Sequence, residues 1–369
     1  MNIVIAPDSF KGSLCATEAA EAMQRGFEAI FENAVFSVFP MADGGEGTLQ
    51  SFSYKKQVPI QHHTVRNAYG QNKEASVLIH KEQAIIETAS IVGLTDYSVD
   101  QLSPHMSTTF GVGEMISHAL DQGCKKIIVG LGGSATNDGG AGMLEALGVH
   151  FWKGSTKLSD IRAQDLATIE SIDISTLDPR LSEVDILIAS DVNNGLTGPQ
   201  GATAVFGPQK GVLANQVETL DQALSNYGER LASHLIDQPG AGAAGGLGFA
   251  LLSIGGRFEQ GAKVIAEALM LPEAIKKADL IITGEGKTDF QTAFGKVPHF
   301  VASQAKESNK PVILISGSLD TEMDAVDDLF SASFSIMYGP CTLNYAMEHA
   351  AFLTEARSKE IAKLVALLI

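Results

Sequence analysis

Short runs of apolar, largely β-branched residues recur along the chain and end in loops rich in glycine, aspartate or serine. Runs of this length without polar interruption are typical of strands that are buried on both faces of a parallel sheet. The clearest runs cover residues 3–6, 36–39, 127–129, 186–189, 280–282 and 312–315. We therefore predict parallel strands at these positions.

Amphipathic helical patterns lie between these runs. One stripe contains Ala20, Met23, Phe27 and Ile30, and longer patterns cover 112–120, before Gly123, and 217–235. Such stripes predict helices that cover a sheet. The alternation of strand and helix indicates an α/β protein, in which ligands bind at the carboxyl ends of the strands.

The segment from 63 to 88 breaks this alternation. Its apolar runs, 63–68, 75–80 and 84–88, are separated by short polar turns, which favours antiparallel hairpins. A chain of 369 residues is also longer than one compact core usually organises. We therefore predict a discontinuous α/β domain, residues 1–59 with 278–369, and an inserted mixed α/β domain, residues 60–277.

Composition narrows the class of partner. The formal net charge is −17, which argues against a nucleic acid or an anionic membrane as partner. No apolar stretch reaches the length of about 20 residues that a membrane helix needs. The three cysteines are isolated and no signal peptide is evident at the start, so we expect a cytoplasmic protein with reduced thiols. The oligomeric state stays open.

Glycine is clustered in four loops that have carboxylates beside them. The clusters cover 42–48, 130–140, 240–248 and 284–289. Successive glycine amides can wrap a phosphate, and Mg²⁺ is usually held by one or two carboxylates plus phosphate oxygens. The second cluster follows a strand and precedes a short helical pattern, 143–147, so a helix N-terminus is expected to face an anion there.

One standard nucleotide motif is excluded and a second has little support. Gly286-Lys287-Thr288 imitates the end of a P-loop, but Ile281 stands where that motif needs its first glycine. The second cluster has no G-x-G-x-x-G pattern, which weakens a Rossmann dinucleotide site. Four lysines in loops are candidates for binding anions in this acidic chain: Lys11, Lys210, Lys287 and Lys296.

Six blocks of sequence together resemble the type 1 glycerate kinase family. They cover 6–13, 41–48, 130–140, 201–211, 240–248 and 284–292, and they occur in the family's order. The resemblance implies a flavodoxin-like domain with a second domain inserted, and transfer of the γ-phosphoryl group of ATP to D-glycerate, most often giving 2-phosphoglycerate. The chain departs from the family at Lys287, where Arg is common, and at Asn193-Asn194-Gly195, where an acidic residue, Asn and Pro are common.

The candidate site follows from the resemblance and from the chemistry of phosphoryl transfer, which needs positioning and charge neutralisation. We assign catalysis to Asp43, Asp191, Asp289 and Lys11, and Mg²⁺ coordination to Asp191 and Asp289. Substrate and phosphate binding is assigned to Asp8, Ser9, Lys11, Gly132, Gly133, Ser134, Asn137, Asp138, Lys210, Glu285, Lys287 and Lys296. The residues do not decide which aspartate is the base.

Three other interpretations stay open. The same kinase could give 3-phosphoglycerate, and a non-catalytic protein that binds small acids would also use glycine-rich loops and lysines. An oxidoreductase of hydroxy acids would need a dinucleotide fingerprint, which the chain lacks.

Overall fold

The chain divides into two compact units. The computed structural model describes residues 1–290, 292, 296–320 and 328–368. Unit 1 contains residues 1–43, 50–58 and 262–369, and unit 2 contains 44–49 and 59–261. The domain ranges predicted from the sequence remain a prediction beside this division, which places residues 262–277 with unit 1.

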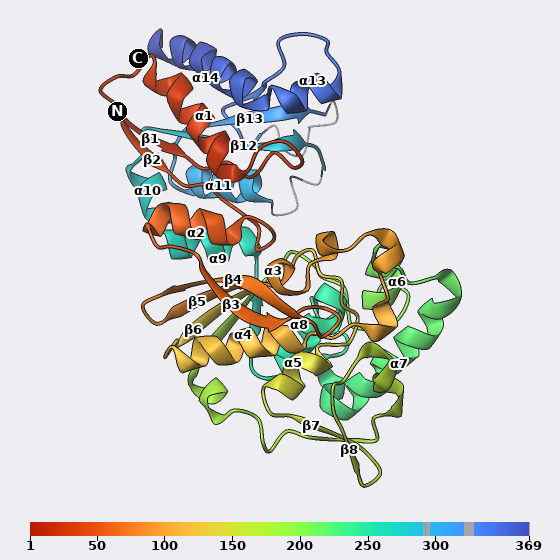
Figure 1. The fold of residues 1–369 in the computed structure, drawn as a ribbon. Helices are drawn as coiled ribbons and strands as arrows, with labels where there is room; N and C mark the ends of the chain where they lie inside the picture. Colours follow the sequence, from red (N-terminus) through yellow and green to blue (C-terminus); the bar gives the residue numbers. More distant parts are fainter. Residues whose placement is uncertain (291, 293–295, 321–327, 369) are drawn as a thin grey trace. The chain divides into compact units, whose positions relative to one another are not determined.

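Unit 1 is built on a five-stranded sheet in the order β14-β13-β12-β1-β2, in which all four pairs are parallel (Figure 1). The strands are β1 (Asn2–Ile5), β2 (Val35–Val38), β12 (Leu280–Thr288), β13 (Val312–Leu319) and β14 (Ala332–Ser335). Counted within the unit, the order is 2-1-3-4-5, that of flavodoxin-like folds. This order reverses direction between β1 and β12, and such a switch point is where doubly wound sheets bind ligands.

Helices cover both faces of this sheet (Figure 1). They are α1 (Ala16–Glu28), α2 (Thr48–Lys56), α9 (Gly261–Leu269), α10 (Leu271–Lys277), α11 (Val297–Glu307), α13 (Leu343–Glu348) and α14 (Ala350–Ala366). Helix α1 begins after Cys15, whose thiol and backbone amide form a capping box with Glu18. It packs on α14 through Gly26, where an added Cβ would lie 2.5 Å from the Glu355 carbonyl oxygen. The predicted stripe of Ala20, Met23 and Phe27 is buried in the core of the unit.

Unit 2 contains a six-stranded mixed sheet in the order β11-β10-β6-β5-β4-β3. Its strands are β3 (Gln61–Arg66), β4 (Asn72–His80), β5 (Gln83–Glu87), β6 (Lys126–Gly130), β10 (Asp185–Ala189) and β11 (Arg257–Glu259). The pairs β3–β4 and β4–β5 are antiparallel, and the pairs from β5 to β11 are parallel. The hairpins predicted between 63 and 88 are therefore confirmed.

Helices and a small sheet complete unit 2. The helices are α3 (Thr88–Val92), α4 (Phe110–Asp121), α5 (Ala141–Ala146), α6 (Ala202–Phe206), α7 (Val217–Ala232) and α8 (Ala243–Ser253). The small sheet joins β7 (His150–Lys153), β8 (Thr156–Leu158) and β9 (Ser171–Asp173). Helix α4 packs on β3 and β5, α8 packs on β10 and β11, and α5 contacts both helices. Buried Tyr227 of α7 contacts Phe151 and Phe249 in the core.

The fold class predicted from the sequence is confirmed: a parallel α/β sheet is combined with a second, mixed α/β sheet. One prediction of local structure is wrong. The cluster 284–289 was expected to be a loop, but β12 continues through it to Thr288. The glycines let β12 pair with β13 along this stretch because the two backbones lie very close together. A Cβ at Gly284 would lie 2.0 Å from the carbonyl oxygen of Ile315.

Candidate functional site

Three of the predicted residues in unit 1 lie in the loop after β1, beside the switch point between β1 and β12. The loop is fixed to β12 by a hydrogen bond of 2.8 Å from the Asp8 amide to the carbonyl oxygen of Gly284. The backbone of Lys11 crosses Gly286, where an added Cβ would lie 3.2 Å from the Lys11 nitrogen. Asp8 and Ser9 are half-buried, and Lys11 is exposed.

Carboxylates meet at this edge of the sheet. Asp43 follows the neighbouring strand β2, and its charge acts on Asp8. Burial, and then the charge of Asp43, raise the pKa of Asp8 to about 7, although the Ser9 amide donates to Asp8 Oδ1 at 2.7 Å. A carboxyl group with this pKa exchanges protons near neutral pH and favours a nearby cation or proton.

Glu285 lies on β12 at the centre of a hydroxyl network. Its Oε1 accepts hydrogen bonds from Thr288 Oγ1 at 3.0 Å and from Thr292 Oγ1 at 2.6 Å. Thr288 Oγ1 also contacts Ser316 Oγ on β13 at 2.6 Å. Glu285 is 5% exposed, and burial raises its pKa. Its carboxylate is therefore held by hydroxyl groups of β12 and of the segment after it, and Ser316 of β13 supports Thr288 in turn.

The two predicted lysines of this segment pair with its carboxylates. Lys296 Nζ lies 3.7 Å from Glu285 Oε2 and 3.9 Å from Asp289 Oδ1. Lys287 Nζ lies 3.4 Å from Asp289 Oδ2 and 3.7 Å from Asp320 Oδ2. Asp289 thus has a lysine beside each oxygen, which offsets its charge. Lys296 is one-third exposed and Lys287 is mostly exposed, so both can also meet an anion from solvent.

In unit 2, the loop after β6 offers backbone donors. Among the described residues, none accepts a hydrogen bond from the amides of Gly132, Gly133 or Ser134. Gly133 has a φ of +61°, which favours glycine. The first glycine cluster lies directly against this loop, since a Cβ at Gly130 would be 1.9 Å from the Gly44 carbonyl oxygen. Two of the predicted glycine clusters therefore meet in unit 2, beside three available amides.

Asp138 is wholly buried and binds the backbone from within the fold. Its Oδ2 accepts from the Thr109 amide at 2.7 Å, Thr109 Oγ1 at 2.8 Å and the Gly142 amide at 3.1 Å, and its Oδ1 accepts from the Gly140 amide at 3.2 Å. The amide of Met143 donates to Thr109 Oγ1. At the N-terminus of α5, where the sequence predicts an anion, the amide of Gly142 is bonded to the Asp138 carboxylate and that of Met143 to Thr109. Burial raises the pKa of Asp138, and its four hydrogen bonds oppose that shift.

Lys210 and Asn137 are also inside unit 2. Lys210 is 2% exposed and donates from Nζ to Ser134 Oγ at 3.1 Å and to the Thr136 carbonyl oxygen at 2.7 Å. Burial lowers the pKa of Lys210 to about 7, although the charge of Asp138 opposes this. Asn137 donates from Nδ2 to Thr203 Oγ1 at 3.0 Å. In this structure both side chains contact the protein interior.

Glu87, which is not among the site residues predicted from the sequence, lies at the carboxyl end of β5. It is 6% exposed, and its Oε1 accepts from the Leu49 amide at 2.6 Å. Burial raises its pKa to about 7, against the hydrogen bonds from Leu49 and Thr48. The next residue, Thr88, donates to the carbonyl oxygens of Gly130 at 2.9 Å and Gly132 at 3.2 Å. A carboxylate at the end of a buried apolar run was the signal that could have identified it.

The three aspartates predicted to be catalytic belong to both units. Asp43 and Asp289 lie in unit 1, whereas Asp191 follows β10 in unit 2 and accepts from the Gly261 amide at 3.3 Å. Their convergence therefore stays a prediction. The part of the chain that the structure describes contains no group of three or more His, Cys, Asp or Glu side chains able to hold a metal ion.

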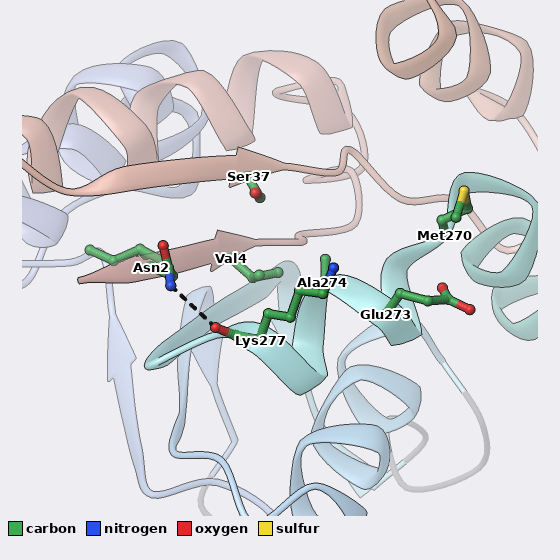
Figure 2. Close-up of a pocket in the computed structure, with 8 residues that line it drawn as sticks. Asn2, Val4, Ser37, Met270, Glu273, Ala274 and Lys277 are labelled. Atoms are coloured by element: carbon green, nitrogen blue, oxygen red, sulfur yellow. Dashed lines mark hydrogen bonds between the residues drawn. The ribbon is translucent and has the colours of Figure 1, made fainter.

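A groove of about 340 Å³ in unit 1 lies away from these residues (Figure 2). It is lined by residues of β1, β2 and α10 and by Met270, which precedes α10. Asn2 Nδ2 donates to the carbonyl oxygen of Lys277 at 3.4 Å across one end of it. No predicted site residue lines this groove, so it is not the candidate site. Among the described residues, no helix is both long and apolar enough to cross a membrane.

Comparison with known proteins places the chain in one family. The model of the glycerate kinase family matches residues 3–366. The chain is 44% identical to a glycerate kinase of Bacillus subtilis (strain 168) and 42% identical to a glycerate 2-kinase of Escherichia coli (strain K12). Each alignment covers 100% of this chain and 98% of the relative.

A solved structure agrees with these relatives. It is a crystal structure of a protein from Salmonella typhimurium LT2, provisionally named glycerate kinase 2, with a TM-score of 0.90 and 42% identity. The match covers 100% of this chain and 98% of that chain. The chain therefore belongs to the glycerate kinase family and is an enzyme, a kinase.

Proposed function

We propose that this protein transfers the γ-phosphoryl group of ATP to a hydroxyl of D-glycerate in the cytoplasm and gives 2-phospho-D-glycerate. The observation that carries the proposal is the full-length match to the glycerate 2-kinase of Escherichia coli at 42% identity. The carboxylates and lysines at the switch point of unit 1, and the available amides in unit 2, supply the charges and donors that phosphoryl transfer uses.

The proposed roles follow from exposure and charge. Lys11 and Lys296 neutralise anionic groups of the substrates, and Lys287 assists at the more exposed edge. The amides of Gly132, Gly133 and Ser134 bind an oxyanion, as glycine-rich loops commonly do. In the reaction, the glycerate hydroxyl oxygen forms a bond to the γ-phosphorus while the bond to the β–γ bridging oxygen breaks, and a carboxylate accepts the hydroxyl proton.

The base is one of Asp43, Asp191 and Asp289 in this proposal. Asp289 has a lysine near each of its oxygens, and these two cations hold its carboxylate in place at the switch point. The same lysines make Asp289 less suited to a divalent cation than its sequence position indicated.

Magnesium fits the chemistry of the donors in unit 1. Asp43 raises the pKa of Asp8, so two carboxylates are near enough to repel each other, and a cation relieves such repulsion. Mg²⁺ needs only one or two carboxylates beside phosphate oxygens. Asp43 and Asp8 are therefore added to Asp191 and Asp289 as candidates to hold it, and the ion would offset the charge of the transferring phosphoryl group.

The test is ADP release by the whole protein, with D-glycerate present, absent or replaced by lactate, and with or without chelation of divalent metal. We expect release that requires both glycerate and metal, and a phosphate ester at carbon 2 by ³¹P and ¹H NMR. An ester at carbon 3 would correct the product. Glycerate binding without ADP release would favour a non-catalytic binding protein.

A further inference from the structure

The loop after β6 is fixed at several points that leave its amides open. The Leu94 amide donates to the Gly133 carbonyl oxygen at 2.6 Å, and the Ala135 amide donates to the Val92 carbonyl oxygen at 2.8 Å. These bonds hold one side of the loop to Val92, the last residue of α3, and to Leu94, which follows the helix. The amides of Gly132 and Gly133 stay without an acceptor among the described residues.

Lys210 holds the loop from the other side. Its Nζ bonds to Ser134 Oγ and to the Thr136 carbonyl oxygen, so one ammonium group joins the two residues that flank Ala135. With 2% of its surface exposed, Lys210 is shielded from solvent. Its position is set by the short 3₁₀ turn 208–210, which ends at Gly211 with a φ of +91°.

Burying a lysine side chain is energetically unfavourable. Taking an ammonium group out of water disfavours its charged form, as the lowered pKa of Lys210 reflects. The charged group that acts on it is Asp138, which also acts on the buried Tyr227. An apolar side chain such as Met would pack at lower cost, but it could not bond to Ser134 and Thr136. The two hydrogen bonds from the buried Nζ therefore indicate that Lys210 serves to fix the geometry of the loop.

We infer that Lys210 is a positioning residue, which fixes the loop so that the amides of Gly132, Gly133 and Ser134 bind an oxyanion of a substrate. The sequence placed Lys210 in contact with the ligand, whereas here it acts through the loop. The oxyanion is a phosphate of the nucleotide or the carboxylate of glycerate. This inference rests on the proposed function.

The experiment compares Lys210→Met with Lys157→Met, which replaces an exposed lysine on β8 of the same unit. We expect Lys210→Met to raise the KM for one substrate, ATP or glycerate, by about tenfold or more, because hydrogen bonds that shape the loop are lost. The KM for the other substrate and the KM values of Lys157→Met should stay within about twofold of wild type. Which KM rises identifies the oxyanion.

A second variant separates positioning from direct contact. Ser134→Ala removes one acceptor of Lys210, and its effect should overlap with that of Lys210→Met, so the double variant should be no worse than Lys210→Met alone. Additive losses, or a folded Lys210→Met with both KM values unchanged or raised equally, would overturn the inference. If Lys210→Met does not fold, Ser134→Ala should still raise the KM for one of the two substrates by a few-fold and leave the other unchanged. Two unchanged KM values, or an equal rise in both, would then overturn the inference.

The proposed function is checked separately. Titration calorimetry with ADP and with D-glycerate measures binding without turnover. If the wild-type protein binds ADP or D-glycerate but shows no glycerate-dependent ADP release, the kinase proposal is wrong. In that case the inference about Lys210 still predicts that Lys210→Met weakens the binding. A wild-type protein that binds neither would contradict both.

Discussion

Replacing Asp138 tests whether its carboxylate is a structural cap or a ligand group. In Asp138→Ala, four donors inside unit 2 lose their acceptor. At about 1 kcal/mol or more for each orphaned donor, the free energy of unfolding should fall by at least about 4 kcal/mol. That is a large part of the 5–15 kcal/mol typical of a whole domain.

Asp138→Asn should cost far less. An Asn carbonyl oxygen in the place of Oδ2 keeps three of the four hydrogen bonds and loses only the bond from the Gly140 amide. Removing the charge also relieves part of the burial cost that raises the pKa of Asp138. We therefore expect a loss of about 1 kcal/mol for Asn, against about 4 kcal/mol or more for Ala.

The assay is urea unfolding followed by the fluorescence of Trp152. It is the single tryptophan of the chain and lies on β7, so it reports on the unit that contains Asp138. Asp237→Ala, at an exposed position of unit 2, is the control and should unfold within about 0.5 kcal/mol of wild type. An Asp138→Ala variant that unfolds like the control but loses activity would refute the structural role and restore Asp138 as a ligand group.

Three further predictions concern other carboxylates and Lys11. The pKa of Glu87 is about 7 in the folded state, above its ordinary 4.5, so the free energy of unfolding falls as pH rises between these values, by up to ~3 kcal/mol. Glu87→Gln should remove this fall. If the urea midpoints of variant and wild type run parallel from pH 4.5 to 8, the prediction is wrong. Asp43→Asn should lower kcat in the ADP-release assay by about 100-fold or more, with a Tm within a few degrees of wild type, since Asn keeps the shape without the charge; full activity would remove Asp43 from the mechanism. Lys11→Ala should lower kcat/KM by about tenfold or more at unchanged Tm, because Lys11 is exposed beside the switch point, and an unchanged kcat/KM would make it a surface lysine.

The sequence pattern was sufficient for the strands and for the mixed character of the middle segment. Continuous apolar runs such as 186–189 became buried parallel strands, because burial on both faces leaves no polar positions along the run. The order of the strands was not contained in the pattern. It depends on which edge of β1 pairs with β12, and these strands are far apart in the chain.

The candidate site was harder to predict because burial is a property of the fold. Lys210 and Asp138 have the residue types of a phosphate site, but loops distant in sequence enclose them, so their partners are hydroxyls and backbone groups of the protein. Glu285 was expected in a loop, yet it lies on β12, because strand pairing with β13 overrides the glycines on each side. No local signal at these positions distinguishes a ligand group from a buried one.

The discontinuity of unit 1 has a consequence for the order of folding during synthesis. All the strands of unit 2 have been made once residue 259 leaves the ribosome, whereas the sheet of unit 1 needs residues up to 335. Unit 2 can therefore fold before β12 has been synthesised. Until then, the edge of β1 that later pairs with β12 has no partner strand. An open edge is a template for pairing with another chain, so the nascent protein is most exposed to aggregation in that interval.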